Sequence, residues 1–301
     1  MTEISDVIQL INERDATSWS LVGRLPGGYL QGAHELRGPR GERVVLKWHP
    51  RHLSAAQLAA AARSVQRLRN RGWPTSGWLA YGVLPDGAAY IVEEFVDGAV
   101  PTQIDGDGLD QLLRANRLQA DVRPETDQDW SSYIHRVVFD GEADLVARMR
   151  ARPVTAALLG RLERLTAGAR SFRLPITDLV HGDFVLRNML VADGSLRIID
   201  TAHVGKGTRA YDLACLLLET TVEDGWADPT IDPRRLEDEC LALVGPAGLR
   251  VCLVGRMLHY LVFGESWRNY DPSELVAKCG SFIERYEPPE VSGRDHRSRL
   301  R

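Results

Sequence analysis

The 301-residue sequence predicts an α+β protein of two lobes, a small antiparallel sheet with one packed helix followed by a larger, mainly helical lobe. Up to Gly98, short β-branched runs alternate with Gly and Pro turns. From about residue 108 onward, Leu, Ala and Arg recur at helical spacing. A polar motif at 181–188, flanked by apolar runs, interrupts this helical part.

The smaller lobe is expected in the order strand, strand, strand, helix, strand, strand, after a short opening helix. Apolar residues on one face of the opening helix are Ile4, Val7, Ile8 and Ile11. Strands are expected at 19–25, 33–36, 43–48, 77–84 and 88–95. The long helix is expected over 54–70, with Ser54 as its N-cap. Short connections between the strands favour an antiparallel sheet.

The larger lobe is expected over residues 98–287, which leaves 1–97 as the smaller lobe. Its clearest helical stretch is Arg148–Ala169, and 210–286 is again mostly helical. A small hairpin is expected over 189–199, directly after the polar motif. The remaining residues, 288–301, are polar and basic and are expected to form a flexible tail.

Composition is that of an ordinary globular protein, with 44% hydrophobic and 26% charged residues. The net charge of −4 and the absence of a long basic block argue against a nucleic-acid partner. No apolar run approaches the roughly 20 residues of a membrane span, and the N-terminus lacks a signal-peptide pattern. The four cysteines have no C-x-x-C pairing, so we expect buried free thiols and a cytoplasmic location.

The polar motif is His181-Gly-Asp183-Phe-Val-Leu-Arg-Asn188, and Ile-Ile-Asp200 follows it. This is the H-x-D-x-x-x-x-N spacing of a kinase catalytic loop. Phosphoryl transfer needs a carboxylate that orients the attacking hydroxyl, a role we assign to Asp183. It also needs oxygen ligands for Mg²⁺, which Asn188 and Asp200 offer. The alternative is that these residues form plain turns and that Asp200 caps the next element.

The motif and its surroundings resemble the aminoglycoside phosphotransferase family, the small-molecule branch of the protein-kinase-like fold. The family shows His-Gly-Asp, four residues, Asn, then Ile-Asp and a downstream Gly-x-x-x-x-Asp-Leu-Ala, here Gly207–Ala214. The resemblance covers about Trp19 to about Tyr286. It implies a bilobal kinase-like fold with ATP, or GTP, and Mg²⁺ as cofactors. It also implies that His181 and Asp212 brace the catalytic loop.

The resemblance assigns the nucleotide to the smaller lobe. Lys47 at the end of a strand is the candidate for the lysine that pairs with the α- and β-phosphates; the alternative is an exposed edge-strand lysine. Gly27 and Gly28 lie in the turn that corresponds to the phosphate-covering loop. The adenine is expected to contact the Glu94 carbonyl and the Val96 N–H.

One departure from the family concerns the helix over 54–70, which contains no Asp or Glu. The family places a Glu on this helix to pair with the strand lysine. Either the partner of Lys47 comes from elsewhere in the chain, or nucleotide phosphate alone holds it.

Acidic runs suggest the charge of the acceptor. Six acids and no base lie between Glu93 and Asp110, and eight acids against two arginines lie between Glu219 and Glu239. Such a surface would favour a cationic substrate, although a solvated helical face is the commoner cause. The candidate substrate residues are Glu219, Glu223, Asp224, Asp228, Glu265 and Asp271.

These observations favour an ATP- and Mg²⁺-dependent O-phosphotransferase that acts on a hydroxyl of a small cationic molecule, as a monomer or homodimer. The resemblance points to an aminoglycoside or basic peptide antibiotic, which phosphorylation would inactivate. A metabolic kinase for choline-like or sugar substrates and a non-catalytic nucleotide-binding pseudokinase are the alternatives. A protein kinase is disfavoured, because only eleven residues lie between Asp200 and Asp212 and leave no long activation segment.

Overall fold

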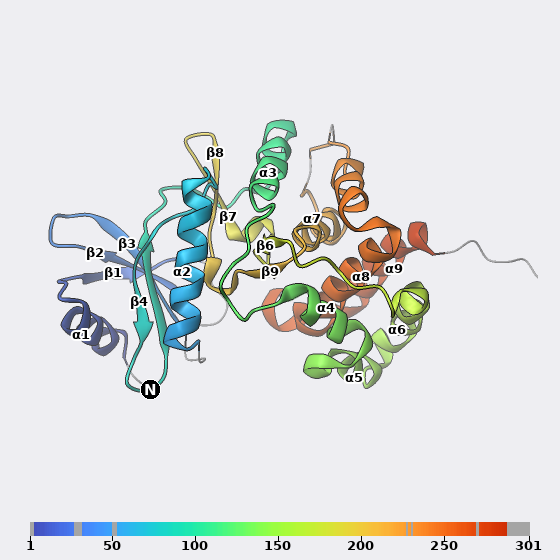
Figure 1. Cartoon of the computed structure of the whole chain (residues 1–301), viewed down its shortest axis with the longest axis horizontal. Helices are drawn as coiled ribbons and strands as arrows, with labels where there is room; N and C mark the ends of the chain where they lie inside the picture. The colour runs from blue at the N-terminus through green and yellow to red at the C-terminus, as the bar shows by residue number, and fades with distance from the viewer. Residues whose placement is uncertain are drawn as a thin grey trace, which may run out of the picture.

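The computed structural model describes residues 3–26, 32–49, 53–226, 228–229, 231–268 and 271–287. It confirms the two-lobed α+β prediction, with a sheet-rich lobe on the left of Figure 1 and a helical lobe on the right. The last strand of the main sheet ends at Glu94, just before the predicted boundary. The predicted tail, 288–301, lies outside the described residues.

The smaller lobe is built on one five-stranded antiparallel sheet. Its order is β1-β2-β3-β5-β4, and every neighbouring pair is antiparallel. The strands are β1 (Ser20–Arg24), β2 (Ala33–Arg37), β3 (Arg43–His49), β4 (Trp78–Val83) and β5 (Ala89–Glu94). Since side chains alternate across a strand, Leu46 packs toward one face while Lys47 faces the other.

Two helices cover this sheet. Helix α1 (Ile4–Asp15) buries Val7, Ile8 and Ile11, the predicted stripe, in one core cluster with residues of β2, β3 and β5. Helix α2 (Ala55–Asn70) begins at Ser54, which forms the predicted N-cap through a capping box with Gln57. Leu58 of α2 packs with Ile91 of β5, so the two helices pack against residues of opposite sheet faces (Figure 1).

The larger lobe is helical around two small strand pairs. Its helices are α3 (Gly106–Leu118), α4 (Trp130–Phe139), α5 (Leu145–Arg150), α6 (Pro153–Thr166), α7 (Ala210–Val222), α8 (Arg234–Arg268) and α9 (Pro272–Ile283). Strand β6 (Asp178–Val180) pairs with β9 (Gly205–Gly207), and β7 (Met189–Ala192) pairs with β8 (Ser195–Ile198) in the predicted hairpin.

Helix α8 crosses the core of this lobe and packs along α7. It is kinked where Gly245 has φ 63° and Pro246 follows. Residues 234–264 are long and apolar enough to cross a membrane, and 61% of their apolar window is buried inside the lobe. Burial of Val251, Cys252 and Leu253 accounts for this composition without a membrane. All four cysteines are free and buried, as expected.

Direct contacts join the lobes beside the polar motif. Ile198 N donates to Pro74 O at 2.6 Å, and Thr75 Oγ1 donates to Ile198 O at 2.7 Å. Trp78 Nε1 of β4 donates to Thr201 Oγ1 at 3.0 Å. These bonds fix the segment that carries Asp200 against the smaller lobe.

Candidate active site

The motif at 181–188 is a loop between β6 and β7 that Asp212 holds from below. Asp212 lies in the first turn of α7 and is fully buried. Its Oδ2 accepts bonds from His181 N at 2.8 Å and Gln119 Nε2 at 2.7 Å, and its Oδ1 accepts from Gly182 N at 2.9 Å. Burial raises the pKa of Asp212, and these hydrogen bonds offset part of the rise. The structure thus places Asp212 where a loop brace must lie.

His181 ties the loop to the segment that precedes Asp200. The ring is 1% exposed. Its Nε2 bonds Ile199 O at 3.0 Å, and its Nδ1 accepts from Asp183 N at 3.3 Å. Because both ring nitrogens serve main-chain groups, His181 holds the two segments together and has no nitrogen left for proton transfer.

Gly182 permits this loop conformation for two reasons. Its φ of +87° is a left-handed conformation that favours glycine. A Cβ at this position would lie 2.1 Å from the ring of Trp130. Trp130 is itself fixed, because its Nε1 donates to His203 O at 3.0 Å and its ring stacks on Tyr211. The ring of Trp130, at the start of α4, therefore fills the space beside Gly182.

The carboxylate of Asp183 is gripped by two arginines. Arg256 of α8 bonds its Oδ1 at 2.7 Å, and Arg187 bonds its Oδ2 at 2.6 Å. Asn188 Nδ2 also donates to Oδ2, at 2.9 Å. Burial raises the pKa of Asp183, but the two guanidinium groups outweigh burial and hold that pKa well below its usual range. Asp183 is therefore ionised at neutral pH.

Asn188 bonds this carboxylate, and the residue before Asp200 bonds Asn188. The Nδ2 of Asn188 donates to Asp183 O at 2.8 Å as well as to Oδ2, which leaves its amide oxygen for a cation. Ile199 N donates to Asn188 O at 2.8 Å, so the neighbour of Asp200 is bonded to Asn188. Asp200 has φ 65°, and Lys47 lowers its pKa against the opposing effect of burial.

These two oxygen-bearing side chains fit Mg²⁺, which takes one or two protein ligands and completes its shell with phosphates and water. Within the described residues, no cluster of three or more His, Cys, Asp or Glu side chains could hold a metal. A cation at Asn188 and Asp200 would thus depend on nucleotide phosphates for further ligands.

Lys47 reaches this group from the sheet and has a carboxylate partner. Its Nζ lies 2.6 Å from Glu93 Oε1 and 3.8 Å from Asp200 Oδ1. Ser76 Oγ donates to the other oxygen of Glu93 at 2.9 Å. Burial lowers the pKa of Lys47, but the carboxylates of Glu93 and Asp200 raise it by more than burial lowers it. The net pKa lies above the usual value, so the amine stays charged. The lysine is not an exposed edge residue.

The position of Glu93 answers the question left by the acid-free helix α2. Val45 pairs directly with Glu93 between β3 and β5, so Lys47 is its diagonal neighbour on the same sheet face. The partner of the lysine thus comes from a strand. Counting Glu93 among solvated surface acids was wrong, because its side chain is 5% exposed and already paired.

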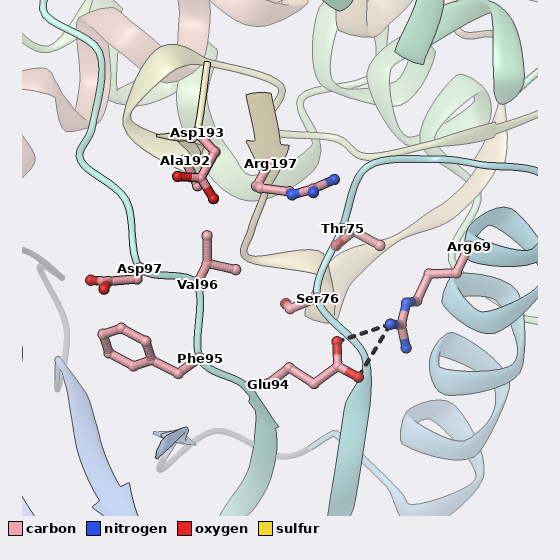
Figure 2. Close-up of a pocket in the computed structure, with 10 residues that line it drawn as sticks. All are labelled: Arg69, Thr75, Ser76, Glu94, Phe95, Val96, Asp97, Ala192, Asp193 and Arg197. Atoms are coloured by element: carbon pink, nitrogen blue, oxygen red, sulfur yellow. Dashed lines mark hydrogen bonds and ion pairs between the residues drawn. The ribbon is translucent and has the colours of Figure 1, made fainter. Parts of the chain in front are cut away.

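The segment after β5 borders a pocket of about 380 Å³, which Figure 2 shows. Glu94 turns its side chain to Arg69 at 2.9 Å and accepts from Gly77 N at 2.9 Å. Arg197 of β8 and Asp193 of the β7–β8 turn line the opposite wall (Figure 2). Neither Lys47 nor the motif residues line this pocket, so it is separate from the point where the catalytic candidates meet.

Two nucleotide assignments stay predictions. The Glu94 carbonyl and the Val96 N–H lie in the segment that joins the lobes, as adenine recognition requires, but no contact tests their role. Gly27 and Gly28 lie outside the described residues.

The acidic residues proposed to bind substrate do not form one surface. Glu219 is 1% exposed and accepts from Leu186 N at 2.9 Å and Trp226 Nε1 at 3.1 Å. It supports the catalytic loop from inside, so its assignment as a surface acid was wrong. Asp224 pairs with Lys278 at 3.0 Å, and Asp271 caps α9 by accepting from Ser273 N and Glu274 N.

The other three candidates lie apart in the chain. Glu223 and Asp228 are partly exposed and follow α7. Glu265 belongs to α8, and its side chain lies outside the described part of the structure. The structure therefore gives the acidic runs several separate local roles, and the charge of the acceptor stays a prediction.

Sequence reasoning missed the two arginines that hold Asp183. Arg187 stands inside the motif, one residue before Asn188, and its charge was a visible signal. Arg256 was harder to find, because only the topology brings α8 to the loop. Its signal is a lone arginine in the otherwise apolar stretch 251–258, since such residues are rarely buried without a partner.

Comparisons with known proteins agree with this geometry. The model of the phosphotransferase enzyme family matches residues 22–252, so the chain belongs to that family. No curated protein matches the chain.

Solved structures share the fold. Aminoglycoside phosphotransferase APH(4)-Ia is 18% identical with a TM-score of 0.66, over 95% of this chain and 100% of that one. The amicoumacin kinase hAmiN, in complex with AMP-PNP, Ca²⁺ and Ami, is 16% identical with a TM-score of 0.56, over 94% of each chain. APH(3'')-Id from Streptomyces rimosus is 19% identical with a TM-score of 0.50, over 85% of this chain and 99% of that one.

Proposed function

We propose that this protein is an ATP-dependent phosphotransferase that moves the γ-phosphoryl group to a hydroxyl of a small molecule, an antibiotic. The observation that carries the proposal is the convergence of Asp183, Asn188 and Asp200 beneath Lys47, with Lys47 Nζ 3.8 Å from Asp200. Membership of the phosphotransferase family supports it.

Each of these residues has a defined task in the transfer. Lys47 binds the α- and β-phosphates, and Glu93 keeps its amine oriented. Asn188 and Asp200 would hold Mg²⁺, which would supply positive charge to the phosphates during transfer. Asp183 accepts a hydrogen bond from the acceptor hydroxyl and aligns its oxygen with the γ-phosphorus. Asp212 and His181 keep the loop in the conformation that these contacts require.

The acceptor class rests on the structural neighbours. Related folds are described in ternary complexes with ADP and hygromycin B, with ADP and streptomycin, and with Ami in an amicoumacin kinase. We infer a hydroxyl-bearing acceptor, cationic as aminoglycosides are, whose phosphorylation adds negative charge and confers resistance. Use of ATP and four buried free thiols support a cytoplasmic location.

The test measures release of ADP from ATP, or of GDP from GTP, with and without Mg²⁺. The acceptors offered are aminoglycosides, amicoumacin, basic peptide antibiotics, choline and sugars. Mass spectrometry then identifies the phosphorylated acceptor. Mg²⁺-dependent transfer to an antibiotic, with reduced growth inhibition in cells that carry the gene, supports the proposal. Transfer to choline or a sugar alone indicates a metabolic kinase, and nucleotide binding without turnover indicates a pseudokinase.

A further inference from the structure

The two arginines on Asp183 differ in how firmly the fold holds them. The side chain of Arg256 is 5% exposed, whereas that of Arg187 is 26% exposed. Each bonds a different carboxylate oxygen, Arg256 to Oδ1 and Arg187 to Oδ2. The contact to Oδ1 is thus made by a buried arginine, and the contact to Oδ2 by an arginine that is partly exposed to solvent.

The charged side chain of Arg256 is buried among apolar residues, which is energetically unfavourable. Its neighbours along α8, Val251 to Leu258, are almost all fully buried apolar residues. Its Nε is buried without a hydrogen-bond partner, and its guanidinium lies 4.7 Å from the ring centre of Tyr260. Placing a charge in such a core is unfavourable unless a partner compensates it. Asp183 is its ion-pair partner in the described structure. The position of Arg256 is therefore explained by its hold on Asp183.

Arg187 is in a different situation. It lies close enough to Arg256 for the two positive charges to repel, and both guanidinium groups bond the carboxylate of Asp183. An additional anion in the crevice would relieve this repulsion. Arg187 also precedes Asn188, the metal-ligand candidate, so its side chain starts beside the place where nucleotide phosphates are expected.

We propose that Arg256 is a positioning residue that permanently holds Asp183 through Oδ1, and that Arg187 is an exchangeable guanidinium that yields Oδ2 to the acceptor hydroxyl and turns to the γ-phosphoryl group. This rests on the proposed function. The acceptor oxygen forms a bond to the γ-phosphorus while the bond from phosphorus to the β–γ bridging oxygen breaks. ADP leaves with that electron pair, and the hydroxyl proton passes through Asp183 Oδ2 to solvent. Arg187 neutralises charge on the transferring group.

The experiment compares methionine and lysine substitutions at both positions. Methionine keeps the bulk of the side chain without its charge, and lysine keeps the charge without the planar fork. Arg161→Met is the matched control, because Arg161 pairs with Glu287 through two bonds of 2.9 Å away from the crevice. ADP release is measured with ATP alone, where water is the acceptor, and with any acceptor that the wild type phosphorylates. Thermal unfolding gives the folded fraction of each variant.

Arg256→Met should lower kcat about 100-fold, since misplacing a catalytic group costs roughly this much, and should leave KM for ATP unchanged. Arg256→Lys should not restore kcat, because a shorter buried ammonium cannot reach Oδ1 in the same geometry. Arg187→Met should lower kcat about 1,000-fold, as loss of an arginine on the transferring phosphate does. Its KM for the acceptor should be unchanged or lower, because a competitor for Oδ2 is gone. Arg187→Lys should restore part of kcat.

Unchanged kcat in Arg256→Met, per folded protein and relative to Arg161→Met, would overturn the positioning role. A raised acceptor KM with unchanged kcat in Arg187→Met would mean that Arg187 binds an anionic group of the acceptor, and would overturn the exchange. If the loss of kcat in each variant is explained by its lower folded fraction, both arginines act only in folding, and both proposed roles are overturned. A wild type that releases no ADP with any acceptor refutes the proposed function itself, a result distinct from an active wild type with unaffected variants.

Discussion

The ion pair between Glu93 and Lys47 gives the sharpest prediction about the smaller lobe. In Glu93→Gln, Ser76 keeps a hydrogen-bond acceptor, but Lys47 loses a carboxylate oxygen at 2.6 Å. The amine, 13% exposed, is left with Asp200 at 3.8 Å. Removing one partner of a buried ion pair lowers the free energy of unfolding by about 3–5 kcal/mol. Because Asp200 still faces the amine, we expect a loss of about 3 kcal/mol here.

Thermal unfolding measures this loss, which should lower Tm by about 5–10 °C for a chain of this length. Lys47 should also move toward Asp200 and compete with Mg²⁺, so KM for MgATP should rise about tenfold, equivalent to about 1.4 kcal/mol. The control is Glu125→Gln, which removes exposed ion pairs with Arg63 and Arg67 and should change neither quantity by much. If Glu93→Gln matches this control in Tm and KM, the strand carboxylate does not hold the lysine.

Two further substitutions test the support of the catalytic loop, and a third tests a buried histidine of α8. Gly182→Ala should destabilise the protein by about 1–2 kcal/mol from backbone strain alone, and by more because the new Cβ would clash with Trp130. Adding Trp130→Ala to this variant should remove the part of the loss that comes from the clash. A double-mutant cycle measured by urea unfolding would show this. Asp212→Asn should cost about 2–3 kcal/mol, because an amide N–H₂ replaces one of the oxygens that accept from His181, Gly182 and Gln119; an unchanged urea midpoint would contradict the brace. Burial lowers the pKa of His259 to about 4, so as pH falls from its usual pKa of 6.5 toward 4 the unfolded chain binds a proton that the folded chain refuses, and stability decreases. The loss is about 2 kcal/mol at pH 5, and His259→Gln should show a smaller fall in Tm between pH 7 and pH 5 than the wild type.

Local patterns were sufficient to predict the elements of the smaller lobe. Helix α2 begins at Ser54 and ends at Asn70 as its capping and turn residues predict. The motif predicted which side chains would meet, because Asp183 and Asn188 are close in sequence and β7 and β8 bring Asp200 back beside them. These are short-range features, which sequence spacing determines directly.

Contacts between segments that are distant in the chain could not be predicted from the sequence. The partner of Lys47 depends on the register of β3 against β5, which places Glu93 diagonally opposite. The partner of Asp183 depends on where α8 crosses the lobe, and the sequence shows only an unexplained arginine there. Glu219 looked like one acid of a surface run, although its helix turns it inward to Leu186 N. Charge counts along a chain do not reveal which carboxylates the fold uses internally.

The most direct test of the central claim is Mg²⁺-dependent ADP release by Asp183→Asn, a nearly isosteric change that removes the negative charge and replaces one accepting oxygen with an amide N–H₂. The account predicts that release falls at least about 1,000-fold while ATP still binds, because Lys47, Asn188 and Asp200 remain in place. Release at the wild-type rate from a folded Asp183→Asn protein would contradict it.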